Sequence, residues 1–188
     1  EFIKAIAVVQ KQIPNIEVFL LGSAAKVKYQ EKLKQLVKEL NLEDKIKFLG
    51  RRSDIADILK DADLLVLSTQ TPEAFGRVII EAGATGTCVC ASRIGGITEI
   101  IEDKKDGLLF DVKDQSSMAE AIVTLLKNRD LMKQCSYNLR KKVEERFSLE
   151  RMVSETLKVY QEAVSEKNIL VIKLGGLGDL ILAIPSLR

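Results

Sequence analysis

Histidine is absent from this chain of 188 residues, and cysteine is scarce. Without histidine there can be no Ser-His or Cys-His nucleophilic pair and no histidine-ligated metal. Cys88 and Cys90 alternate with Val89 in a strand-like stretch, so their side chains share one sheet face. A disulfide within one strand is unfavourable, and a metal site would need more ligands than Cys88, Cys90 and Cys135 supply. We therefore interpret the cysteines as core residues of a protein in a reducing cytoplasm.

Long apolar runs are also missing. None reaches the roughly 20 residues of a membrane span, and no signal peptide opens the sequence. The net charge of +2, from 29 basic and 27 acidic residues, does not require a nucleic-acid partner. An apolar fraction of 46% is enough for a packed core in one or two domains. Residues 1–5 resemble the middle of a helix, so we expect the chain to start inside a domain.

Short apolar segments alternate with helical ones along the chain. We predict strands over 16–21, 46–49, 63–68, 88–92 and 108–111, and helices over 1–13, 29–40, 54–61, 75–84, 98–101, 116–128, 130–147 and 149–165, with Ser53 as a possible helix cap. This alternation predicts an α/β fold with a doubly wound, Rossmann-like parallel sheet. Ligands of such folds bind beyond the carboxyl ends of the strands. The candidate functional segments lie at such ends: Gly22–Ser23, Gly50–Arg51, 68–76 and 93–99.

The most informative segment is Pro72–Ala82, in which seven residues separate Glu73 from Glu81. Gly76 lacks a Cβ and so lets the backbone approach a ligand closely. The helix that follows offers unpaired N–H groups to an anion such as a pyrophosphate. Because Glu81 lies in an apolar, small-residue stretch, we expect it to be buried and to need donors such as ribose hydroxyls. In the alternative interpretation Glu73 is a helix cap and Glu81 belongs to a solvated face.

This E-x7-E pattern resembles the signature of retaining GT-B glycosyltransferases, in particular glycosyltransferase family 4. The resemblance covers about residues 1–165 and includes the segments 19–22, 46–50, 62–68, Gly95–Gly96 with Glu99, and 107–110. It implies the C-terminal half of a GT-B fold, with a nucleotide-diphospho-sugar as donor substrate and neither a cofactor nor a metal. It also implies retaining transfer of a hexose-type sugar to a cell-envelope glycan or lipid acceptor.

The resemblance assigns roles to individual residues. Glu73 would be catalytic beside the donor sugar, and Glu81 would hold the ribose. Gly22, Ser23, Gly50 and Arg51 would surround the nucleotide, and the backbone at Phe75, Gly76, Arg77 and Val78 would meet the diphosphate or the sugar.

The sequence departs from the family at three points. It begins after the family's first strand and after a Gly-Arg…Lys-Gly segment that grips the diphosphate, so we expect a sheet without its first strand. Arg77 or Lys26 could supply part of the missing charge. Ala24 replaces a second glycine, and Cys88 replaces a proline. We expect weak donor binding and no transfer by this chain alone.

The last residues resemble another family. The segment 169–179 reads as a buried strand and a glycine-rich turn, similar to the N-terminus of family 9 heptosyltransferases, in which Asp179 would be the catalytic base. This implies domains at 1–166 and 167–188 and a role in lipopolysaccharide biosynthesis in a Gram-negative bacterium. A dinucleotide fingerprint is a weaker match because Ile181 occupies the third glycine position. The tail could instead add a strand, over 169–174, to this chain's sheet or to a neighbour's, making a dimer.

Two other functions stay open. One is a different GT-B enzyme, such as a nucleotide-sugar epimerase or a phosphorylase. The other is a non-catalytic nucleotide-binding module. The full-length protein could also associate peripherally with a membrane.

Overall fold

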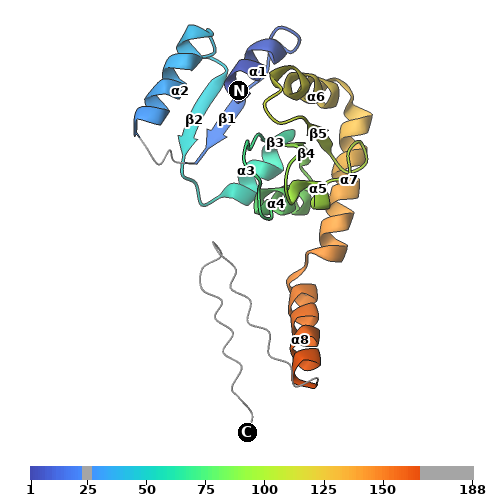
Figure 1. Ribbon diagram of the computed structural model, residues 1–188. Coiled ribbons are helices and arrows are strands. Elements are labelled where there is room, and N and C mark those ends of the chain that lie inside the picture. Colours follow the sequence, from blue (N-terminus) through green and yellow to red (C-terminus); the bar gives the residue numbers. More distant parts are fainter. Residues whose placement is uncertain (23–26, 166–188) are drawn as a thin grey trace. The chain divides into compact units, whose positions relative to one another are not determined.

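A computed structural model describes residues 1–22 and 27–165 (Figure 1). Its strands are β1 (Val18–Leu21), β2 (Ile46–Gly50), β3 (Leu64–Leu67), β4 (Cys88–Ser92) and β5 (Leu108–Phe110). Its helices are α1 (Phe2–Val9), α2 (Val27–Glu39), α3 (Ile55–Asp61), α4 (Arg77–Thr85), α5 (Ile97–Ile100), α6 (Gln115–Lys127), α7 (Arg129–Arg146) and α8 (Leu149–Ser165).

The described strands form two open parallel sheets. β1 pairs with β2, and β4 lies between β3 and β5. Every residue of β4 is buried, whereas every residue of β3 is only half-buried, because β3 is an edge strand and β4 is a central one. The alternation of helices with parallel strands confirms the predicted α/β class with open parallel sheets.

The core lies between the sheets and the helices α1 and α6, which pack on each other (Figure 1). Ile3, Ile6 and Val9 are buried at the helical spacing expected of a one-sided helix. Phe110 of β5 is among the largest fully buried side chains. α2 contributes one buried residue, Val37, to this core.

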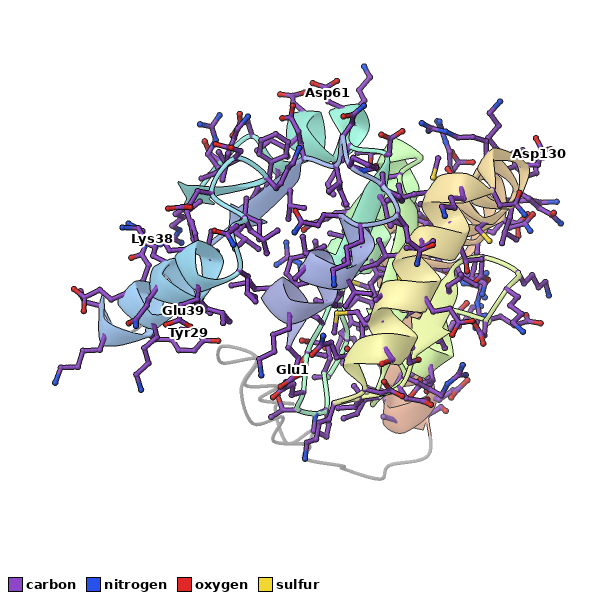
Figure 2. All side chains as sticks on the ribbon, turned by 90° about the horizontal axis from the view of Figure 1, so that it is seen from above. Glu1, Tyr29, Lys38, Glu39, Asp61 and Asp130 are labelled. Atoms are coloured by element: carbon purple, nitrogen blue, oxygen red, sulfur yellow. The ribbon has the colours of Figure 1, made fainter. Side chains whose placement is uncertain are left out.

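The exposed side of α2 is mostly polar. Figure 2 shows the side chains of Tyr29, Lys38 and Glu39 pointing outward from α2. No helix in the described residues is long and apolar enough to cross a membrane.

The predicted elements are confirmed, with shifts at their ends. The first helix stops at Val9 instead of residue 13, and the chain continues as a turn in which the N–H groups of Gln12 and Ile13 both donate to the Val9 carbonyl at 2.9 Å. α4 starts at Arg77 instead of Phe75, because Gly76 is left-handed. Asp54, not Ser53, is the N-cap of α3.

The Asp54 side chain makes no capping bond because the Arg52 guanidinium holds its carboxylate, at 2.8 and 2.5 Å. That hydrogen bond lowers the pKa of Asp54.

The chain divides into two compact units, Glu1–Glu145 and Arg146–Arg188. The described part of the second unit contains α8, which exposes apolar side chains, including Leu149, Val153 and Leu157. The predicted boundary at 166/167 and the predicted strand at 169–174 lie outside the described residues and stay predictions.

α4 packs closely on α7 at Gly83. A Cβ added there would lie 2.6 Å from Val143 Cγ2 and 3.0 Å from Leu139 Cγ, both on buried residues of α7. Gly83→Ala should therefore lower the free energy of unfolding by about 1–3 kcal/mol through overpacking. Helix propensity alone would raise the free energy of unfolding by about 0.5–1 kcal/mol. The sign of the change therefore distinguishes overpacking from helix propensity. Urea denaturation measures the effect. Ala84→Gly, on the exposed face of α4, is the control, because it exchanges the same two residue types at an exposed position. Stabilisation by Gly83→Ala would refute the close contact.

The Asp103 side chain makes hydrogen bonds to β5 and to the residue that follows β4. Its carboxylate accepts hydrogen bonds from the Leu109 N–H at 2.9 Å and from the Arg93 guanidinium at 2.7 Å. Partial burial raises the pKa of Asp103, but these two donors outweigh burial and hold it below its usual value.

A lowered pKa stabilises the fold above the unfolded-state pKa of about 3.9, and this stabilisation disappears as the pH falls through the folded-state value. We expect Asp103→Asn to cost about 1 kcal/mol at pH 7 and clearly less at about pH 2. Urea denaturation at both pH values checks this, with Glu120→Gln, an exposed carboxylate, as control. An equal cost at both values would show that the charge of Asp103 has no role.

Candidate functional site

The loop between β3 and α4, residues 68–76, carries the first predicted carboxylate; we call it the Glu73 loop. Glu73 is half-buried, and its Oε1 lies 3.4 Å from the backbone nitrogen of Gly76, a long hydrogen bond. Thr69 Oγ1 donates to the carbonyl of Thr71 at 3.0 Å, which fixes the start of the turn. The loop thus folds back on itself and holds the Glu73 carboxylate beside the start of α4.

Gly76 joins this loop to α4. It is buried and is the N-cap of the helix, with φ 69° and ψ 48°, a left-handed conformation that favours glycine. A Cβ there would also lie 3.1 Å from Ile79 Cδ1. Because glycine has no side chain to cap the helix, the first-turn N–H groups at Arg77 and Val78 have no side-chain cap bond. These groups and the helix dipole favour an anion at this end.

The prediction that Glu81 is buried is wrong. Its side chain is 42% exposed, because it lies on the same face of α4 as Arg77, one turn earlier, and away from the buried Ile79 and Ala82. The Arg77 guanidinium lies 3.5 Å from Glu81 Oε1 and is itself 83% exposed, so the pair is weak. The carboxylate of Glu81 is therefore accessible to a hydroxyl-rich ligand, and its solvated position is the one that the alternative interpretation described.

A second group of predicted residues meets at the ends of β1 and β2. The Gly22 N–H donates to the carbonyl of Gly50 at 2.8 Å. Both glycines have positive φ, 112° and 68°. Apart from each glycine and its chain neighbours, no atom of the described residues lies within 4 Å of an added Cβ at either one. Arg51 is exposed next to them. Gly22, Gly50 and Arg51 therefore lie together at the ends of β1 and β2.

The predicted site residues within the described part of the chain thus lie in two groups. One is around Gly22 and Gly50, and the other is along the Glu73 loop and α4. Exposed Phe75 lies in the second group. Ser23 and Asp179 lie outside the described residues. The roles of all these residues stay predictions.

Sequence reasoning missed the contact between the Glu73 loop and the segment after β4. Gly96 N–H donates to the carbonyl of Glu73 at 2.9 Å, and the buried Ser92 hydroxyl contacts the start of the same loop. The adjacent glycines 95 and 96, directly after a parallel strand, were the available signal.

The described residues contain no cluster of three or more acidic or cysteine side chains that could hold a metal. Cys88, Cys90 and Cys135 are free and buried in the core, as predicted. Burial raises the pKa of the Cys90 thiol, which is consistent with a packing role.

Comparisons with known proteins identify the family of this chain. Residues 1–142 match the family model described as glycosyl transferases group 1. An N-acetyl-alpha-D-glucosaminyl L-malate synthase of Bacillus anthracis is 35% identical over 132 residues, which are 70% of this chain and 34% of that protein.

Solved structures share the fold. HepE of Anabaena in complex with UDP-glucose has a TM-score of 0.78 and 30% identity, over 84% of this chain and 44% of that one. A sucrose-phosphate synthase of Thermosynechococcus elongatus has a TM-score of 0.77 and 27% identity, over 88% and 43%. This chain thus spans less than half the length of these relatives. The family match and the shared fold together show that the chain belongs to the glycosyl transferases group 1 family, of GT-B type.

Proposed function

We propose that this chain is the donor-binding domain of a retaining, metal-independent glycosyltransferase of family 4. The observation that carries the proposal is the geometry of the Glu73 loop, in which left-handed Gly76 connects a half-buried carboxylate to the N-terminus of α4. In the transfer, the bond between the sugar's anomeric carbon and the phosphate oxygen breaks and a bond to the acceptor hydroxyl oxygen forms. The nucleoside diphosphate and the hydroxyl's proton are released.

The diphosphate is assigned to the N-terminus of α4. A charge that develops on a leaving diphosphate needs dipoles already in place, and the first-turn N–H groups of α4 supply them. Arg77, exposed at the same end, adds a positive charge.

The sugar and the ribose are assigned to the two carboxylates. Glu73, next to the first turn of α4, faces the donor sugar. Glu81 lies one turn further along α4, and its accessible carboxylate would accept hydrogen bonds from ribose hydroxyls. The open backbone at Gly22 and Gly50, with Ser23 and Arg51, is assigned to the rest of the nucleotide.

We propose UDP as the nucleotide, because HepE, which is similar over most of this chain, was crystallised with UDP and with UDP-glucose. The acceptor would be a cell-envelope glycan or lipid, handled by the full-length protein in the cytoplasm, with peripheral membrane association. The same proposal includes a heptosyltransferase-like second domain that starts at residue 167, with Asp179 as its catalytic base. It also includes dimerisation through residues 169–174.

Donor binding is directly testable. Isothermal titration of the chain with UDP, GDP and ADP should show weak binding, strongest for UDP. Glu81→Ala should weaken UDP binding by about 1–3 kcal/mol, because the ribose hydroxyls lose their acceptor. Glu120→Ala, which removes an exposed carboxylate of α6, should leave binding unchanged. The proposal fails if the folded chain binds none of the three nucleotides, and the role of Glu81 fails if both variants bind UDP alike.

A further inference from the structure

Two loops touch backbone to backbone at the carboxyl ends of β3 and β4. The Gly96 N–H donates to the Glu73 carbonyl at 2.9 Å. A Cβ on Gly96 would lie 2.5 Å from the carbonyl oxygen of Ala74, and a Cβ on Gly95 would lie 2.8 Å from the carbonyl oxygen of Glu73. These distances are too short for any side chain, so the Glu73 loop rests directly on the glycine pair.

The two glycines are needed for different reasons. Gly95 has φ 56°, so its conformation as well as its surroundings favour glycine. Gly96 has φ −61° and ψ −13°, an ordinary helical conformation that any residue adopts. A side chain at Gly96 is excluded only by the short distance to Ala74. A substitution at Gly96 therefore tests the contact with the Glu73 loop and not the backbone conformation.

Ser92 holds the start of the same loop. It is fully buried at the end of β4, and its hydroxyl lies 2.8 Å from the Thr69 carbonyl and 3.0 Å from the Leu67 carbonyl. A hydroxyl has one hydrogen, so these two carbonyls share it. The loop is therefore fixed at its start by Ser92 and in its middle by Gly96, while Gly76 sets its end.

We propose that Ser92 and Gly96 are positioning residues that set the place of the Glu73 carboxylate and of the Gly76 backbone against the bound donor. The inference rests on the proposed function, since it assigns a support to the same site. Catalytic geometry tolerates only about 0.5 Å of error, and a misplacement of about 1 Å can cost roughly 100-fold. Restoring an ordinary contact of about 3.4 Å at Gly96→Ala requires a displacement of about 0.9 Å from the present 2.5 Å.

The test compares two matched pairs of variants by UDP titration below their melting temperatures. Gly96→Ala is paired with Gly107→Ala, whose Cβ would lie 2.9 Å from the Val89 carbonyl, away from the loop. Ser92→Ala is paired with Ser136→Ala, which removes a hydroxyl bond to the Gly86 carbonyl. We expect Gly96→Ala and Ser92→Ala to raise the Kd for UDP at least tenfold, and the controls to change it less than twofold whatever their loss of stability.

A crystal structure of Gly96→Ala separates this inference from the proposed function. We expect residues 73–76 to move by about 1 Å while β3, β4 and α4 stay in place. An unmoved loop overturns the inference even if the wild-type chain binds no nucleotide. If the wild type binds UDP and Gly96→Ala binds it equally well, the positioning role is also refuted.

Discussion

The parallel pairing of β3 with β4 is the constraint on which the candidate site depends. Its register runs from Leu64 opposite Cys88 to Leu67 opposite Ala91, so the two strands end within one residue of each other. The Glu73 loop and the glycine pair after β4 therefore leave the sheet side by side. Because β4 is buried along its whole length, a shift of this register would disturb close packing on both of its faces.

Glycines permit close packing at three points around the Glu73 loop and α4. Gly83 lets α4 approach α7, Gly96 lets the Glu73 loop rest on the next loop, and Gly76 turns that loop into α4. Backbone atoms have fewer alternative positions than long side chains, so such contacts cost little entropy to maintain. The half-exposed carboxylate of Glu81 and the N–H groups of α4 thus lie on a rigid element, as a preorganised site requires.

Sequence periodicity predicted the α/β class and the order of the elements, because buried parallel strands such as Cys88–Ser92 are short apolar runs with clear ends. The positions of Gly22, Gly50 and Glu73 at strand ends followed from the same pattern. The exposure of Glu81 did not follow from this pattern, because apolar neighbours in the sequence do not fix the side of a helix on which one residue lies. The support from Ser92 and Gly96 depends on contacts over more than twenty residues, and local patterns do not encode those.

Amide NMR of the chain titrated with UDP tests the central claim most directly, because it locates the ligand on one helix. The account predicts that the amide signals of Gly76, Arg77 and Val78, at the N-terminus of α4, shift as UDP is added, together with those of Gly22 and Gly50. Gly86, the C-cap at the other end of α4, should stay unshifted. Shifts that are as large at Gly86 as at Gly76, or that occur only away from these strand ends, would contradict the account.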